Sequence, residues 1–248
     1  MLKCGATLTL PALTRWVPPS PGEGLNGPSP AIGREREGPA AKPWEGEGAS
    51  KRTERPMDLK AFYRAELNEH AAVLRDTLAQ CEAPFLRLVE AAFKSLQGGG
   101  KLLFFGNGGS AGDAQHLSTE FTVRYVRDRV PIPAIALTTD TSALTAIGND
   151  LGFDQLFARQ VRALGRPGDL AIGITTSGKS RNVILALEVA RELGLGAAAL
   201  TGNDGGALPG LADPLVIVPS RTTARIQEMH ITLGQMLCGA LEQKLGLV

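Results

Sequence analysis

The 248-residue sequence contains only three cysteines, and no two of them form a CxxC pair. Cys4, Cys81 and Cys238 stand far apart along the chain. Thiolate metal ligands and redox cysteines usually come in closely spaced pairs, and disulfide-stapled domains are small and rich in cysteine. The sequence therefore predicts neither a disulfide framework nor a thiolate metal site, which fits a reducing cytoplasm.

Long apolar runs and an excess of one charge are also missing. No stretch reaches the roughly 18 uninterrupted apolar residues of a membrane span. The 26 Lys and Arg residues balance 25 Asp and Glu residues to a net charge of +1, so the charge indicates no nucleic-acid partner and no membrane surface. Residues 1–16 resemble a signal peptide only weakly, because Pro11 and Arg15 interrupt the apolar run. We expect a cytoplasmic protein.

The first 56 residues differ in composition from the rest of the chain. They are crowded with Pro, Gly, Glu and Arg and show no apolar period, although both tryptophans, Trp16 and Trp44, lie there. Such a segment cannot offset the entropy of ordering by burying apolar surface. We predict a disordered N-terminal extension over residues 1–56 and one folded domain over residues 57–248. The abrupt change at Met57 raises the hypothesis that the extension is upstream sequence read from an early start codon.

Two amphipathic helices open the folded part. Apolar residues recur at helical spacing from Leu59 to Leu78, and Asp58 is placed to cap this helix. Pro84 fits the first turn of a second helix, which ends at the glycines of residues 98–100.

Beyond those glycines, short apolar runs alternate with helical patterns. The runs are Leu102–Phe105, Ala134–Leu137, Leu170–Ile174, Ala197–Leu200 and Leu215–Val218. Continuous apolar strands separated by helices are typical of a parallel sheet covered on both faces. The clearest helix is Asn182–Leu193, closed by Gly194, and the last runs from about Thr223 to Leu245. We predict an α/β domain with a five-stranded parallel sheet between two layers of helices.

Two loops follow strands of this sheet, at the edge where ligands bind in open parallel sheets. The first contains Asn107, Gly108, Gly109 and Ser110, and its glycines let backbone N–H groups approach a ligand. A tight strand-to-helix turn is an equally good interpretation of such a loop. The spacing does not match the GxGxxG fingerprint of dinucleotide-binding proteins.

The second loop carries hydroxyl groups directly before a helix. Residues 173–180 read GITTSGKS. Hydroxyls and free N–H groups at a helix N-terminus form an anion site, most often for phosphate. The stretch also fits the GxxxxGK[ST] pattern of P-loop NTPases, which requires an acidic residue at another strand end for magnesium, and only Asp140 is a substitute.

Two pairs of polar residues share helix faces. His116 and Glu120 lie four residues apart after the first loop, at a spacing that lets imidazole and carboxylate chelate a divalent metal. A surface contact would give the same spacing. Gln227 and Gln235 lie eight apart on the last helix, and by themselves indicate nothing.

Taken in order, these motifs resemble the phosphoheptose isomerase branch of the SIS (sugar isomerase) family over nearly all of residues 57–248. The stretches that carry the resemblance are GNGGS at 106–110, DAQH at 113–116, AIAL at 134–137, AIGND at 146–150, TTSG at 175–178, LTG at 200–202 with DGG at 204–206, and ARIQEMH at 224–230.

The resemblance implies a flavodoxin-like fold and an isomerase that converts sedoheptulose 7-phosphate to D-glycero-D-manno-heptose 7-phosphate, an early step toward heptose units of bacterial surface polysaccharides. It also assigns residues. Asn149 and Asp150 would contact sugar hydroxyls, and Glu120 would be the acid–base carboxylate. The phosphate pocket would be formed by Asn107, Gly108, Gly109, Ser110, Thr175, Thr176, Ser177 and Ser180. By the same resemblance the bound cofactor would be one zinc ion held by His116, Glu120, Gln227 and Gln235, with Gln227 also touching substrate.

Two residues depart from the family pattern. Gln235 stands where the family has a histidine that is both metal ligand and catalytic acid–base residue. Glutamine can coordinate a metal but cannot exchange a proton. The chain therefore either relies on Glu120 and water, or uses His230 for the second proton, or has lost the reaction. Lys179 stands where asparagine is common, and its ammonium either adds charge to the phosphate site or points to solvent.

These departures leave two classes of function open. The isomerase is favoured by the retained His116, Glu120 and Gln227. The alternative, favoured by Gln235, is a non-catalytic SIS protein that binds a sugar phosphate as a signal, or that bridges protein partners as a relative does with the bacterial replication initiator. The apolar surface of the first and last helices predicts self-association, and the resemblance implies a homotetramer.

Overall fold

The computed structural model describes residues 57–248, and the extension predicted for residues 1–56 lies outside the described residues. Five parallel strands form one sheet in the order β2-β1-β3-β4-β5. The strands are β1 (Leu102–Gly106), β2 (Ala134–Ala136), β3 (Leu170–Ile174), β4 (Gly196–Thr201) and β5 (Leu215–Ile217). The predicted flavodoxin-like α/β fold is confirmed, since this is the strand order of that fold.

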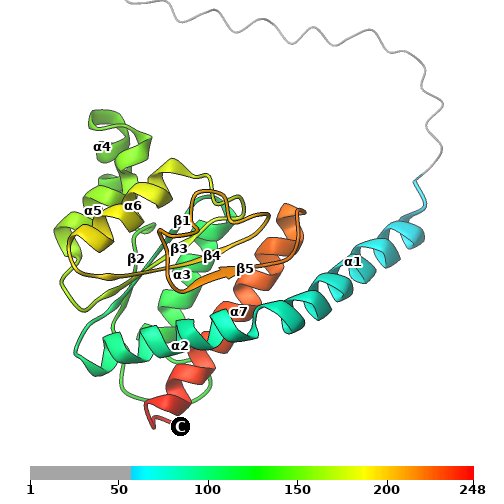
Figure 1. The fold of residues 1–248 in the computed structure, drawn as a ribbon, viewed down its shortest axis with the longest axis horizontal. Coiled ribbons are helices and arrows are strands. Elements are labelled where there is room, and N and C mark those ends of the chain that lie inside the picture. Colours follow the sequence, from blue (N-terminus) through cyan, green and yellow to red (C-terminus); the bar gives the residue numbers. More distant parts are fainter. Residues whose placement is uncertain (1–56) are drawn as a thin grey trace, which may run out of the picture. The chain divides into compact units, whose positions relative to one another are not determined.

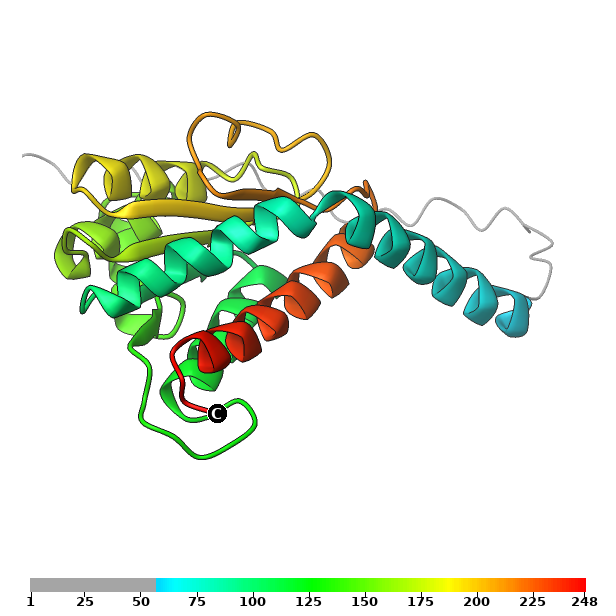
Figure 2. The same cartoon turned by 60° about the horizontal axis from the view of Figure 1, so that its bottom comes forward.

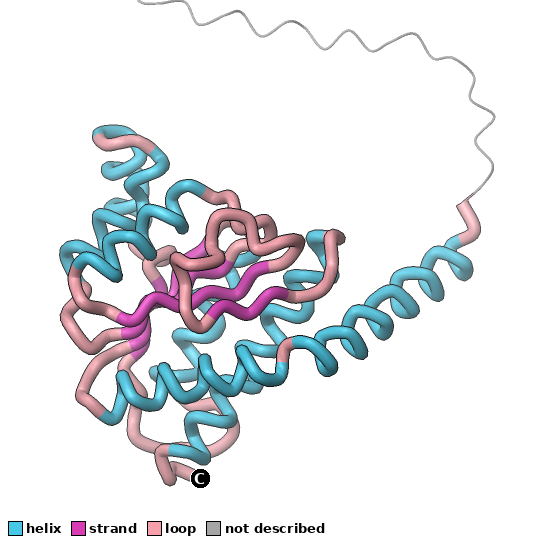
Figure 3. The backbone as a smooth tube through the Cα atoms, viewed as in Figure 1, coloured by secondary structure: helices cyan, strands magenta, loops and turns pink. Residues whose placement is uncertain are grey.

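Helices cover both faces of the sheet (Figures 1 and 3). The helices of the chain's described part are α1 (Leu59–Gln80), α2 (Glu82–Gln97), α3 (Gly109–Thr122), α4 (Thr141–Asp150), the 3-10 turn η1 (Phe153–Gln155), α5 (Leu156–Leu164), α6 (Arg181–Glu192) and α7 (Thr223–Lys244). Helices α2, α3 and α7 lie on one face, and α5 and α6 on the other (Figure 2).

Strand β1 shows why this part of the sequence is so apolar. Leu102 and Phe104 join the core under α2, α3 and α7, whereas Leu103 and Phe105 join the core under α5 and α6. All four are fully buried. Because side chains of a strand alternate between faces, a strand covered on both sides needs an apolar residue at every position.

The predicted element bounds hold with small differences. Asp58 caps α1 as expected, since its Oδ1 accepts the backbone N–H of Lys60 at 3.0 Å and of Ala61 at 3.1 Å. The edge strands β2 and β5 each end one residue earlier than predicted. Leu137 and Val218 still donate backbone hydrogen bonds of 2.9 and 2.8 Å to the neighbouring strand, so the pairing ends gradually at the sheet edges. No helix in residues 57–248 combines the length and the apolar character that crossing a membrane requires.

Candidate active site

The two predicted loops meet at the carboxyl ends of neighbouring strands, since β1 pairs with β3. A reciprocal pair of amides joins them. Asn107 Nδ2 donates to Asn182 Oδ1 at 2.9 Å, and Asn182 Nδ2 donates to Asn107 Oδ1 at 2.8 Å. The glycine loop and the hydroxyl loop are therefore held together as one site.

The hydroxyl loop has the geometry of an anion site. The hydroxyl oxygens of Thr175 and Ser180 lie 3.2 Å apart, and Thr175 is buried. Ser180 is the N-cap residue of α6, yet its side chain makes no capping hydrogen bond. Ser177 Oγ accepts the backbone N–H of Lys179 at 3.2 Å. An anion placed over this helix start would meet hydroxyl groups and the positive end of the helix dipole.

The P-loop interpretation requires an acidic residue for magnesium, and the substitute, Asp140, caps another helix. Asp140 is the N-cap of α4, and its Oδ1 accepts the backbone N–H of Ala143 at 2.9 Å. This carboxylate already serves as a helix cap through one oxygen, and nothing in the described residues brings it to the hydroxyl loop, so the structure gives nucleotide hydrolysis no support.

His116 and Glu120 form the polar centre of the site on α3. His116 Nε2 lies 3.2 Å from Glu120 Oε1, which confirms that the two side chains share one face. The imidazole is half exposed at 50% and the carboxylate is 21% exposed, so both can be reached from solvent.

A close approach of α3 and α7 brings Gln235 to this pair. Gly234 lies against Leu117, and a Cβ atom on Gly234 would stand only 2.6 Å from the Leu117 side chain. Only glycine permits this packing distance, and the next residue then faces His116. Gln235 Nε2 lies 2.5 Å from His116 Nε2, although the two residues are 119 positions apart.

The fourth predicted ligand lies at the glycine loop. A Cβ atom on Gly109 would stand 2.5 Å from Gln227 Nε2, which places the Gln227 amide directly against the backbone of that loop. Thus His116 contacts two of the other predicted ligands, Glu120 and Gln235, and the fourth, Gln227, borders the glycine loop at the start of α3.

This donor set can be compared with what a divalent metal requires. Among residues 57–248, no group of three or more His, Cys, Asp and Glu side chains is placed to hold a metal ion. The set here has one imidazole and one carboxylate, and it is completed only by the two amides. Amide oxygens are acceptable but weak ligands, so the residues fit a divalent ion held less tightly than by two imidazoles.

Asn149 and Asp150 are not brought to the other site residues. They end α4, which projects from the sheet (Figure 1), and both are exposed. The Asn149 side-chain amide donates to Asp150 Oδ1 at 2.7 Å. No side chain of α4 is fully buried, so its surface is free for another contact. Their contact with sugar hydroxyls stays a prediction.

His230 is excluded as the second proton carrier by its position. It is fully buried, and its Nε2 lies 3.1 Å from the carbonyl oxygen of Thr201, so this nitrogen carries the proton and donates it. Burial lowers the pKa of His230 from its ordinary 6.5 to about 4, against a smaller opposite effect of that hydrogen bond. It is a neutral structural residue on the sheet side of α7.

We expect this burial to make the protein sensitive to acid. Below pH 6.5 the unfolded chain gains a proton at His230 that the folded chain does not gain until about pH 4. The stability contribution is therefore complete above pH 6.5 and is lost as the pH falls, by roughly 2 kcal/mol at pH 4.5. Urea unfolding of wild type and His230→Gln between pH 7.5 and 4.5 measures this. The variant should show the weaker pH dependence, and equal slopes would contradict the assignment.

Three supporting residues were not identified from the sequence. Asn182 holds Asn107, as described above. Asp113 lies one turn before His116, and burial raises its pKa to about 6, partly offset by the charge of His116. Arg129 donates from Nη2 to the Glu120 carbonyl oxygen at 2.7 Å and from Nε to the buried Glu242 carboxylate at 2.8 Å. The i, i+3 spacing of Asp113 and His116 was a usable signal. The Asn182–Asn107 contact spans 75 positions and the Arg129–Glu120 contact spans nine positions across a loop, so neither follows a helix or strand period.

Comparison with known proteins identifies the family. The SIS domain family matches residues 67–202. A phosphoheptose isomerase of Paramagnetospirillum magneticum is 58% identical over 186 residues, which cover 75% of this chain and 97% of the relative. The chain belongs to the phosphoheptose isomerase family of SIS-domain proteins.

Solved structures of this family have the same fold. Phosphoheptose isomerase GmhA of Neisseria gonorrhoeae is 44% identical with a TM-score of 0.70, and the match covers 75% of this chain and 99% of that one. A phosphoheptose isomerase of Francisella tularensis is 36% identical with a TM-score of 0.72, covering 75% and 100%. The predicted family is confirmed.

Proposed function

We propose that this phosphoheptose isomerase family member interconverts sedoheptulose 7-phosphate and D-glycero-D-manno-heptose 7-phosphate, with a divalent metal, zinc, bound in each subunit. The observation that carries the proposal is the contact of His116 with both Glu120 and Gln235, and the hydroxyl loop at the start of α6 suits a phosphate. The relatives named phosphoheptose isomerase support the same activity. The reaction would supply heptose units for bacterial surface polysaccharide, and we place it in the cytoplasm.

The hydroxyl loop would bind the phosphate end of the sugar. Thr175, Thr176, Ser177 and Ser180 offer hydroxyl and N–H donors at the start of α6, and residues 107–110 of the glycine loop would line the same pocket. An anchor at C7 leaves C1 and C2 to be oriented by the other end of the pocket, where Asn149 and Asp150 would meet sugar hydroxyls. Fixing the substrate in this way lowers the entropic part of the barrier.

Glu120 would move the proton that the isomerisation requires. Its carboxylate takes a proton from C1 of the ketose and returns it at C2, and the electrons pass through an enediolate. A second proton must move between the oxygens at C1 and C2. Gln235 cannot carry it, so water is the carrier in this chain.

His116, Glu120, Gln227 and Gln235 would hold the metal. When bound, a divalent ion polarises the substrate carbonyl and stabilises negative charge on the substrate oxygens. The chain's own residues position the Glu120 carboxylate. His116 orients the Glu120 carboxylate, and Arg129 fixes the end of α3 that carries Glu120.

An assay on the full chain tests the proposal. Sedoheptulose 7-phosphate is incubated with the protein after chelation and again after addition of zinc, and aldose formation is followed. We expect turnover that depends on added metal. No turnover under either condition would end the isomerase proposal and would favour the non-catalytic alternative that Gln235 leaves open.

The surface of α1 supports self-association. Its exposed apolar side chains include Leu59, Phe62, Tyr63, Leu67, Leu74 and Leu78. Where α1 meets α2 and α7, an apolar groove of about 130 Å³ is lined by Leu78, Phe85 and Met236, among others. Soluble monomers rarely expose so continuous an apolar face. We propose that second copies of the chain cover it, in a homotetramer.

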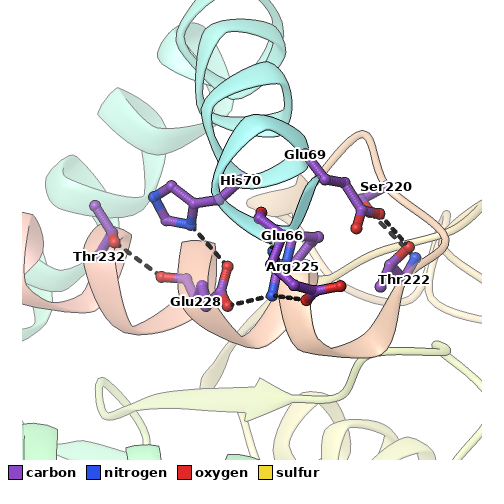
Figure 4. Close-up of polar contacts among 8 residues, drawn as sticks. All are labelled: Glu66, Glu69, His70, Ser220, Thr222, Arg225, Glu228 and Thr232. Atoms are coloured by element: carbon purple, nitrogen blue, oxygen red, sulfur yellow. Dashed lines mark hydrogen bonds and ion pairs between the residues drawn. The ribbon is translucent and has the colours of Figure 1, made fainter. Parts of the chain in front are cut away.

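A polar network holds α1 in the position that exposes this face (Figure 4). His70 Nδ1 lies 2.7 Å from Glu228 Oε2, and Arg225 lies 2.8 Å from Glu228 Oε1 and 3.1 Å from Glu66. Arg225 is buried at the start of α7, next to Gln227. The network therefore fixes both the α1 surface and the helix turn that carries one predicted ligand.

We expect the tetramer to depend on α1. Light scattering at micromolar concentration should give four times the mass of the chain, and Phe62→Glu with Leu67→Glu should give smaller species, because each change places a charge in an apolar interface. Leu151→Glu is a matched control, since Leu151 is an exposed leucine beyond the end of α4. A wild-type protein that elutes as a monomer would contradict the proposal.

A further inference from the structure

A recess of about 310 Å³ lies on the outer side of the hydroxyl loop. Its lining includes Ser177 from that loop, and otherwise Lys179, Asn203, Asp204 and Arg221. Ser177 is thus shared between this recess and the predicted phosphate site. The two basic residues come from different segments, one before α6 and one between β5 and α7.

Hydrogen bonds fix these segments to one another. Asn203 Nδ2 donates to the Thr176 carbonyl oxygen at 2.9 Å, and the Ala207 N–H donates to the Gly178 carbonyl oxygen at 3.0 Å. The Asn203 N–H donates to the Ser220 carbonyl oxygen at 2.9 Å, next to Arg221. The backbone that carries Lys179 and Arg221 is therefore held at a set position relative to Ser177.

Within the described residues, Lys179 and Arg221 form no ion pair. Among residues 57–248, no carboxylate lies within 4.0 Å of Lys179 Nζ or of the Arg221 guanidinium. Asp204, the acidic residue in the lining, accepts the Gly206 N–H at 3.0 Å. That turn is the main cause of the lowered pKa of Asp204, and the charges of Lys179 and Arg221 lower it further. Both cations therefore act on the recess while neither is neutralised by a direct ion pair.

We infer that Lys179 and Arg221 form a basic rim that binds the phosphate group of the substrate together with Ser177, and that selects phosphate monoesters over uncharged sugars. The inference rests on the proposed function, since the phosphate-bearing substrate is taken from it. Arg and Lys are the side chains that bind phosphate most strongly, and here they border hydroxyl donors that are themselves neutral. A dianionic ester gains attraction from both charges, whereas the unphosphorylated sugar gains none.

The rim acts on capture of the substrate rather than on the proton transfer. Its charges lie beside the phosphate loop and contact neither His116 nor Glu120. Charges at an exposed rim raise the association rate and are screened by salt. They lower KM and leave kcat unchanged.

Lys179→Asn and Arg221→Ser in the full chain test the inference. Each should raise KM for sedoheptulose 7-phosphate about three-fold and the double variant about ten-fold, with kcat unchanged. The decrease of kcat/KM with ionic strength should be shallower in the double variant, and Lys179→Arg should keep the wild-type values. Arg159→Ser on α5 removes the same charge at another recess and should change nothing. A double variant with wild-type KM, or an equal effect of Arg159→Ser, would overturn the rim.

A binding measurement separates this inference from the isomerase proposal. Calorimetric titration of sedoheptulose 7-phosphate is made on wild type and on the double variant in the absence of added metal. If wild type binds the ester in this titration but gives no turnover in the assay with added zinc, the isomerase proposal fails while a ten-fold weaker Kd in the double variant still supports the rim. Equal Kd values would overturn the rim even if the isomerase is active.

Discussion

Glu120→Gln is expected to lower kcat for sedoheptulose 7-phosphate by about 10²- to 10⁴-fold, the range that a general acid–base group contributes. The amide has nearly the shape of the carboxylate, and it keeps an oxygen for His116 or for a metal. It cannot accept the proton from C1. The change therefore removes the proposed proton transfer while it preserves the packing of α3.

If Glu120 acts in proton transfer, Glu120→Gln should still bind the sugar phosphate. The phosphate loop begins α6, and none of its hydroxyl or amide contacts involves Glu120. Calorimetric titration of Glu120→Gln with the sugar phosphate should give a Kd close to that of wild type. Metal content is measured on the same samples, because a loss of bound ion would lower kcat by a different route.

A matched carboxylate serves as the control. Glu188 on α6 is partly exposed and pairs with Arg181 at 3.4 Å, so Glu188→Gln removes one negative charge from a surface ion pair that contributes little to stability. Its kcat should equal that of wild type. Glu120→Gln with activity within ten-fold of wild type would remove Glu120 from the mechanism.

The fold was predictable because burial leaves a direct mark on composition. A strand such as β3, buried at all five positions, reads as a continuous apolar run and was predicted with its observed bounds. What covers α1 could not be predicted, also for a physical reason. Its apolar residues were recognised as one helical stripe, but the sequence does not say what covers a stripe, and Leu59 and Leu78 are among the most exposed side chains of the helix.

The site was predictable only where its contacts are local. The four-residue spacing of His116 and Glu120 is fixed by helix geometry, and so is the position of Ser180 at a helix start. Gln235 is different. Its contact with His116 depends on how closely α3 approaches α7, which is decided by Gly234 against Leu117 and has no periodic signature. Resemblance to the family identified Gln235 as a site position, whereas the eight-residue spacing of Gln227 and Gln235 by itself indicated no function.

Gln235→His is expected to raise both metal affinity and kcat by about ten-fold or more. Imidazole is a stronger ligand than an amide oxygen for zinc, and it titrates near neutral pH, so it adds a side-chain proton carrier to a site that otherwise relies on water. Metal stoichiometry after dialysis and kcat at saturating zinc separate the two gains. The first should appear at limiting metal, and the second should remain when metal is in excess.

The position of the side chain decides the outcome, so the control makes the same change elsewhere on α7. Gln243 is exposed about two turns further along α7, and Gln243→His introduces an imidazole away from His116. It should leave kcat and metal content unchanged. If Gln235→His instead loses activity, the amide at this position is a working part of the site rather than a lost histidine. Its close contact with His116 would then be one that the active site uses, with water remaining the proton carrier.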